Sequence, residues 1–441
     1  MKKSFFTSLA LLLISITSFA QKSFQELMEY GVQQSNIGNH ASAQTAFSQA
    51  IALKPEDANA YYNRAVTKAN LKDNRGAIND FDKALELNPR YADAFAGRGQ
   101  SKARQDDHKG ALQDYNSCIA LNPIDANTYF IRGLSKSKLE NFKGALSDFN
   151  KSLDLTPDNA QGYTARGVVK QKLEDYRGSL DDFTKAIEIS PKRSTSYSGR
   201  AYSKMKMGDF KGAIADYGKA LEITPEDAES LYFRGYCKSQ MEDFQGALID
   251  FDRALGQDPE NATAYYGRGF AKSKLGNTKS AIEDFNKAIS IGNIENNKVV
   301  FSGSITKQVL DDLRNGVQER LKMAEMSPER SEVYYNRGLS KARTGETKAA
   351  IEDYNKAIAL NPTYSEAYFT RGMLKSQIND QRGAIQDCTN AIKLNAKYAE
   401  AYYVRGIIRH ALGDTDGCND LSKSGELGYT PAYSVIRDYC N

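Results

Sequence analysis

Apolar and small residues recur with helical spacing along most of this chain, and the pattern repeats. In the segment 126–139, Tyr129, Ile131 and Leu134 occupy positions that one side of a helix would present together. A short polar turn follows, and a second segment of the same kind covers 142–155. The pattern therefore predicts two helices joined by a tight turn.

The helix pair recurs with a fixed period that proline marks. Proline stands at intervals of 34 residues at Pro55, Pro89, Pro123, Pro157, Pro191, Pro225 and Pro259, and the step resumes at Pro328 and Pro362. Proline lacks the next N–H donor and restricts the residue before it, so it ends the second helix. Eighteen residues past most proline slots stand Asp or Asn residues that we expect to be helix N-caps, among them Asp73, Asn141, Asp380 and Asp414.

Short helices of this length are marginal alone in water, and one hairpin cannot cover its own apolar face. Stability must then come from stacking each hairpin on its neighbours. The sequence therefore predicts an all-α solenoid of helix–turn–helix repeats with a 34-residue period.

The slots around each proline resemble the tetratricopeptide repeat family. An aromatic residue fills the slot six residues past the proline at Tyr61, Phe95, Tyr129, Tyr163, Tyr197, Tyr265, Tyr334, Tyr368 and Tyr402. Glycine fills the small slot of the first helix at Gly99, Gly133, Gly167, Gly235, Gly269, Gly338, Gly372 and Gly406. The resemblance implies a right-handed superhelical solenoid whose concave groove is built from first helices and binds peptides or helices.

Five segments follow from the repeat and its breaks. A basic start and a short apolar run predict a signal peptide over 1–20, cleaved before Gln21. Repeats one to eight should cover 21–295, repeats ten to twelve 331–430, and a capping helix 431–441. The segment 296–330 lacks the repeat residues, so it is either a decayed repeat or an irregular insertion with its own role.

Three slots carry charge where the family usually has apolar or aromatic residues. Ten of the first helices have an Arg, nine of these have a Lys four residues on, and an Asp recurs in the second helix of every unit that has the Arg except the last. We expect a ladder of structural ion pairs, represented by Arg132–Asp148, Arg166–Asp182 and Arg234–Asp250. The alternative is a basic stripe that binds an anionic ligand.

The groove that the resemblance implies should present a set of aromatic and cationic side chains from the first helices. The candidate binding residues are Tyr62, Phe130, Tyr232, Tyr266, Tyr335, Phe369, Tyr403, Arg104, Lys138 and Lys172. They favour a protein or peptide partner, although the same aromatics are also expected in packing between repeats. Alternative functions are binding of a cell-wall glycan and self-assembly through the ends of the solenoid.

Composition narrows the classes of function. The chain has 59 Lys and Arg against 55 Asp and Glu, and because the charges are interleaved they predict no nucleic-acid surface. Three isolated histidines and no zinc-spaced cluster predict no enzyme, no metal site and no cofactor. After signal removal, no membrane span is expected, and the protein should be exported to the periplasm or secreted.

The five cysteines do not form a disulfide framework. We expect Cys118, Cys237 and Cys388 to be packed thiols, since sister repeats carry small or aromatic residues there. Cys418 and Cys440 either form a disulfide that holds the capping helix or remain two unpaired thiols.

Overall fold

The computed structural model describes residues 23–292 and 330–440. Within these ranges there are twenty-three α-helices and no strands, which confirms the all-α class. The predicted signal peptide and the segment 296–329 lie outside the described residues.

No helix in the described part of the chain combines the length and the apolar character needed to cross a membrane.

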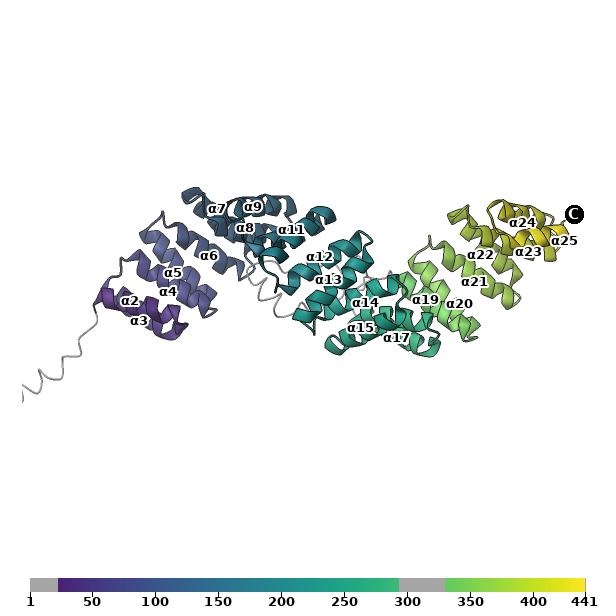
Figure 1. Ribbon diagram of the computed structural model, residues 1–441, viewed down its shortest axis with the longest axis horizontal. Helices are drawn as coiled ribbons and strands as arrows, with labels where there is room; N and C mark the ends of the chain where they lie inside the picture. Colours follow the sequence, from purple (N-terminus) through teal and green to yellow (C-terminus); the bar gives the residue numbers. More distant parts are fainter. Residues whose placement is uncertain (1–22, 293–329, 441) are drawn as a thin grey trace, which may run out of the picture. The chain divides into compact units, whose positions relative to one another are not determined.

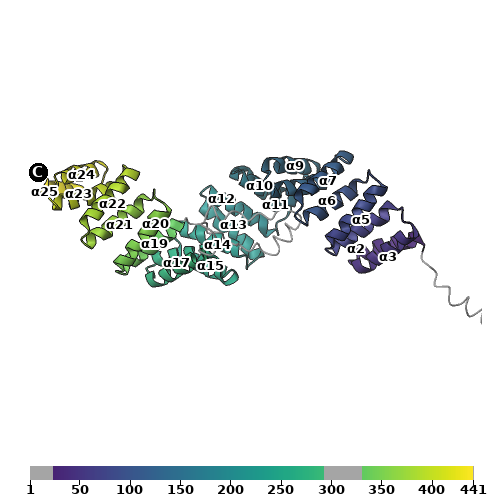
Figure 2. The ribbon, with the colours of Figure 1, turned by 180° about the vertical axis from the view of Figure 1, so that it is seen from behind.

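The described helices fall into two compact units. Each is a run of antiparallel helix pairs in chain order (Figures 1 and 2). The first unit consists of α2 (Phe24–Asn36), α3 (His40–Leu53), α4 (Ala58–Asn70), α5 (Asn74–Leu87), α6 (Ala92–Ala103), α7 (His108–Leu121), α8 (Ala126–Lys138), α9 (Phe142–Leu155), α10 (Ala160–Lys172) and α11 (Tyr176–Ile189).

The second unit continues the same pattern and ends in a single helix. It consists of α12 (Ser194–Lys206), α13 (Phe210–Ile223), α14 (Ala228–Gln240), α15 (Phe244–Gln257), α16 (Ala262–Lys274), α17 (Thr278–Gly292), α19 (Arg330–Arg343), α20 (Thr347–Leu360), α21 (Ser365–Gln377), α22 (Gln381–Leu394), α23 (Ala399–Ala411), α24 (Asp416–Glu426) and α25 (Pro431–Tyr439). α25 packs on α24 at the end of the unit.

The second helices begin where the capping residues predict, with one exception. Asp380 is the N-cap of α22, and its Oδ1 accepts the N–H of Gly383 at 2.9 Å. The prediction was wrong for Asp414, because α24 begins only at Asp416 and its N-cap is Thr415. Asp414 instead accepts the N–H of Asp416 at 3.0 Å.

Most hairpins are closed by an aromatic ring of the second helix that lies against the small slot of the first, while Cys388 in α22 and Leu421 in α24 take the place of the ring. Phe149 and Ala145 are fully buried in α9. A Cβ built on Gly133 of α8 would lie 2.8 Å from Cε1 of Phe149, so the close approach of α8 and α9 requires glycine there.

The stack is continuous across the residues that separate α17 from α19. These two helices pack on each other (Figure 2), in the same way that α15 packs on α16. Arg337 Nη1 in α19 donates to Asn286 Oδ1 in α17 at 2.8 Å, and Asn336 Nδ2 donates to the hydroxyl of Tyr266 at 2.9 Å. The repeat that starts at α19 is therefore the direct structural neighbour of the repeat that contains α16 and α17.

This packing predicts opposite effects for two glycine substitutions. Gly133→Ala should lower the stability by about 1–3 kcal/mol, because the added methyl group collides with the buried Phe149 ring. Gly256→Ala in α15 meets nothing within 4 Å and should raise it by up to about 1 kcal/mol, since alanine favours the helix. Urea unfolding followed by circular dichroism measures both. Equal effects would contradict the close helix contact.

Candidate binding surface

A buried carboxylate in each hairpin binds two cations of the first helix. In α8 and α9, Arg132 donates from Nε and Nη2 to the two oxygens of Asp148, at 2.9 and 2.7 Å. The Nζ of Lys136 lies 2.8 Å from Oδ2 of the same Asp148. Arginine, lysine and aspartate thus form one three-residue group within the hairpin.

The same group recurs in every hairpin from α4 to α22. The arginine–aspartate pairs are Arg64–Asp80, Arg98–Asp114, Arg132–Asp148, Arg166–Asp182, Arg200–Asp216, Arg234–Asp250, Arg268–Asp284, Arg337–Asp353 and Arg371–Asp387. The aspartate side chains are only 0–7% exposed. Buried carboxylates of this kind need opposite charge and hydrogen bonds, and both are present.

The last hairpin also has the group, contrary to the prediction. Arg405 Nη2 lies 2.6 Å from Oδ1 of Asp420, and Arg409 replaces the lysine, with its Nη1 3.0 Å from Oδ2. The aspartate is 15 residues after the arginine instead of 16. One residue fewer separates the paired positions of α23 and α24, so the aspartate lies one position earlier in the sequence.

Most of these arginines also reach the preceding repeat, which the sequence interpretation missed. Arg132 Nη1 donates to Asn116 Oδ1 at 2.8 Å, and Arg166 Nη1 donates to Asn150 Oδ1 at 2.9 Å. The signal was present, because a polar residue lies two positions after most of the recurring aspartates. The arginines therefore join neighbouring hairpins as well as the two helices of one hairpin.

The aromatic residue of the first slot completes the surroundings of the arginine. The guanidinium carbon of Arg132 lies 5.4 Å from the ring centroid of Tyr129, and Arg166 lies 5.3 Å from that of Tyr163. In the first such group, the hydrogen bond from Arg64 to Asp80 raises the pKa of the guanidinium, so it stays charged at any ordinary pH. These cations serve internal pairing, and they do not form an exposed basic stripe.

The seven candidate aromatics divide into buried and half-buried residues. Phe130 and Tyr232 are 6% and 3% exposed and belong to the core of their hairpins, not to a surface that a ligand could contact. Tyr62, Tyr266, Tyr335, Phe369 and Tyr403 are half-buried. Only this second group could meet a partner.

Three of the half-buried rings form pairs along the C-terminal repeats. Ring centroids lie 4.9 Å apart in each of the pairs Tyr335–Tyr364, Phe369–Tyr398 and Tyr403–Tyr429. Such pairs hold neighbouring repeats together and fix the orientation of the exposed ring edges.

The three candidate cations lie elsewhere. Arg104 Nη1 donates to the carbonyl of Ala69 at 3.2 Å, which links α6 to α4. Lys138 lies close to His108, and burial followed by the charge of Lys138 lowers the pKa of that imidazole. Lys172 is half-buried at the end of α10. All three are in the first unit, whereas Tyr266, Tyr335, Phe369 and Tyr403 are in the second.

A different set of residues accompanies the half-buried aromatics. In the three C-terminal repeats, an acidic residue stands three positions before the aromatic and an apolar residue four positions after it, which places all three on one side of the helix. We call this set the acid–aromatic row: Glu332, Tyr335 and Leu339 in α19; Glu366, Phe369 and Met373 in α21; Glu400, Tyr403 and Ile407 in α23. The acidic members were missed, although their regular spacing from the aromatic slot was visible in the sequence.

The acid–aromatic row is accessible and negatively charged. Met373 and Ile407 are 40% and 37% exposed, and Glu366 and Glu400 are exposed. Burial, followed by the negative charge of Glu366, raises the pKa of Tyr335, so the Glu366 carboxylate acts on the ring of the preceding repeat. The row thus alternates carboxylates with rings and exposed apolar side chains.

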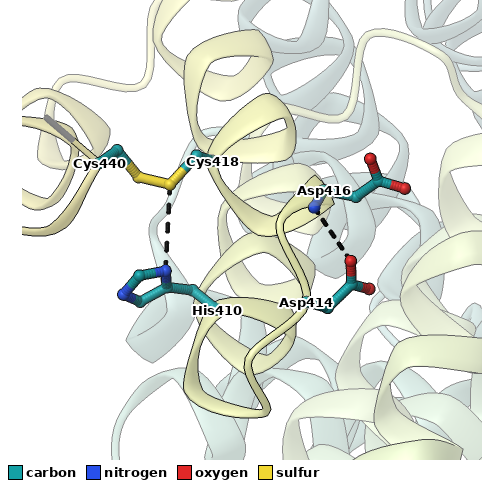
Figure 3. The surroundings of a disulfide bond; sticks show 5 residues. All are labelled: His410, Asp414, Asp416, Cys418 and Cys440. Carbon is teal, nitrogen blue, oxygen red and sulfur yellow. Dashed lines mark hydrogen bonds between the residues drawn. A yellow bond between two sulfur atoms is a disulfide. The ribbon is translucent and has the colours of Figure 1, made fainter.

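The two C-terminal cysteines are bonded to each other. The structure joins Cys418 and Cys440 by a disulfide, with a Cα–Cα distance of 5.6 Å (Figure 3). Cys118, Cys237 and Cys388 are buried thiols, as predicted.

The buried ion pairs predict a large loss of stability when the shared acceptor is removed. Asp148→Ala leaves Arg132 and Lys136 without a counter-ion in a mostly buried position, which should cost about 3–5 kcal/mol. Urea unfolding of the full chain measures the loss. The matched control is Glu188→Ala, which breaks the exposed Lys185–Glu188 pair and should cause no resolvable change. If both variants unfold alike, the Asp148 carboxylate is effectively solvated.

Comparison with known proteins agrees with this architecture. Models of the tetratricopeptide repeat match residues 35–73, 58–91, 126–159, 160–193, 194–227, 228–261, 262–291, 331–364 and 353–386, together more than half of the chain. No curated protein has a significantly similar sequence.

Among solved structures, a tetratricopeptide repeat protein from Parabacteroides merdae is 22% identical, with a TM-score of 0.44 over 59% of this chain and 98% of that one. YrrB, described as a tetratricopeptide repeat protein with an unusual peptide-binding site, is 26% identical, with a TM-score of 0.37 over 41% and 93%. The Cut9–Hcn1 complex is 12% identical, with a TM-score of 0.46 over 89% and 98%. From the repeat matches and its own helical hairpins, the chain belongs to the tetratricopeptide repeat family.

Proposed function

We propose that this chain is a non-catalytic scaffold that binds a segment of a partner protein along the acid–aromatic row of α19, α21 and α23. The observation that carries the proposal is the exposure of Met373 and Ile407 beside half-buried rings on the first helices. Exposed apolar side chains next to rigid rings supply the anchoring contacts that dominate protein interfaces.

The charge of the row selects among partner segments. Its carboxylates Glu332, Glu366 and Glu400 attract lysine and arginine, and ring faces such as that of Tyr403 attract the same cations. The preferred segment therefore combines basic side chains with apolar ones. Self-assembly and glycan binding remain the alternative uses of the surface.

We also propose that the protein acts outside the cytoplasm, in the cell envelope or after secretion. The basic start and apolar run of residues 1–20 support export, and the Cys418–Cys440 disulfide suits an oxidising compartment. Mass spectrometry of the protein recovered from its native cells should find Gln21 as the first residue. Recovery of the full chain with Met1 retained would contradict export.

Selection from a displayed library of random peptides, followed by fluorescence anisotropy, tests the binding function. The enriched peptides should carry lysine or arginine next to apolar residues. Met373→Asp should weaken the binding of these peptides by roughly 10- to 30-fold, since the loss of an interface anchor costs about 2 kcal/mol. Glu366→Lys should weaken it by charge repulsion, and more strongly at low salt than at high salt.

The matched control is Leu394→Asp, because Leu394 is 41% exposed but lies at the end of the second helix α22. It should leave peptide binding unchanged. Peptide binding that is equally sensitive to all three substitutions, or to none, would contradict the assignment to the acid–aromatic row. Sedimentation with purified cell wall that survives Met373→Asp would favour the glycan alternative. Light scattering that shows a concentration-dependent mass would favour self-assembly.

A further inference from the structure

Three ligand-bearing side chains meet at the C-terminal end of the second unit. His410 lies in α23, Cys418 in α24, and Cys440 directly follows α25. The Nδ1 or Nε2 atom of the imidazole and the two sulfur atoms all lie within 4.8 Å of one another. Figure 3 shows the His410 ring facing the disulfide, with its Nδ1 atom 3.9 Å from the Sγ atom of Cys418. No other such group of three occurs among residues 23–292 and 330–440.

This group has the composition of a binding site for a soft metal ion. Thiolate and imidazole are the ligands that Zn²⁺ prefers, and two cysteines with one histidine form a known zinc-binding set. All three residues are partly exposed, so an ion can reach them from solvent. The disulfide, however, uses both sulfur atoms and prevents coordination.

We propose that reduction of the Cys418–Cys440 disulfide creates a Zn²⁺ site formed by these two cysteines and His410. A dithiol reductant transfers two electrons and two protons to the disulfide, yields two protein thiols and itself becomes a disulfide. Binding of Zn²⁺ then releases the two thiol protons and leaves two Zn–S bonds and one Zn–N bond. The fourth position of the tetrahedral ion is open to water or to an outside ligand.

The backbone around the site is held by contacts that do not involve the disulfide. The hydroxyl of Tyr433 in α25 donates to the carbonyl of Gly425 at 2.9 Å, and Ala432 is fully buried. Arg405 and Arg409 of α23 both bind Asp420 of α24. Reduction therefore leaves α23, α24 and α25 in place, and the Cα–Cα distance of 5.6 Å allows the two sulfurs to separate by side-chain rotation.

Local charge is also compatible with a cation. The nearest arginine along the chain, Arg409, is neutralised by Asp420 at 3.0 Å and lies 3.5 Å from Asp414. The site would thus exchange one crosslink for another: a disulfide under oxidising conditions, a metal bridge under reducing ones. Either crosslink fixes the capping helix to the last hairpin.

Zinc titration of the full chain in two redox states tests the proposal. One sample is oxidised; the other is reduced with dithiothreitol, which is then removed without air. In competition with a chromophoric chelator, the reduced chain should bind one more Zn²⁺ than the oxidised chain. The thiols of Cys118, Cys237 and Cys388 are present in both samples, so they do not contribute to this difference. Cobalt in place of zinc should give a thiolate-to-metal charge-transfer band in the reduced sample only.

Variants are compared in the reduced state. No disulfide is present there, so a loss of Zn²⁺ binding cannot be caused by the loss of the disulfide. His410→Ala should weaken Zn²⁺ binding by at least about 100-fold, since losing even an outer-shell partner costs roughly 10- to 100-fold. Cys440→Ser should remove the extra ion, and His108→Ala, a histidine at the start of α7, should change nothing. Equal binding by the two redox states, or full binding by reduced His410→Ala or reduced Cys440→Ser with native helix content, would overturn the proposal.

Discussion

The buried aspartate of the second helix is the constraint on which the arrangement of these hairpins depends. Its carboxylate is almost fully withdrawn from water, so it requires the Arg and the Lys of the first helix in their observed positions. In most hairpins the remaining nitrogen of the same guanidinium, Nη1, then binds a polar side chain of the preceding repeat, as Arg132 binds Asn116. One arginine therefore couples the geometry within a hairpin to the geometry between hairpins, and Gly133 allows the approach that makes this possible.

The same coupling explains why the stack continues from α17 to α19. Arg337 finds its inter-repeat acceptor in Asn286, 51 residues earlier, where other repeats use a residue 16 earlier. The contact is made although the intervening chain is longer by about one repeat. The packing of neighbouring repeats thus depends on which side chains can pair, and the number of residues between them in the sequence matters less.

Much of the fold and of the ion pairing could be predicted from the sequence, because the same residue pattern recurs every 34 residues. The helix pairs, the buried thiols and the pairing of Arg132 with Asp148 follow from residue type and spacing alone. The role of Asp420 did not, because one missing residue shifts the last hairpin out of the period. The burial of Phe130 and the exposure of Met373 also depend on how far each helix is rotated, and spacing does not determine that rotation.

The two proposals for this chain meet on one helix. In α23, His410 follows Ile407 by three residues and Tyr403 by seven, so all three lie on the same side of the helix. A zinc ion on His410 would extend the acid–aromatic row with a cation that has an open coordination position. A partner side chain that supplies nitrogen, sulfur or a carboxylate could fill that position. Because the ion requires reduced cysteines, the redox state of Cys418 and Cys440 would change the charge and ligand preference at this end of the row without moving its helices.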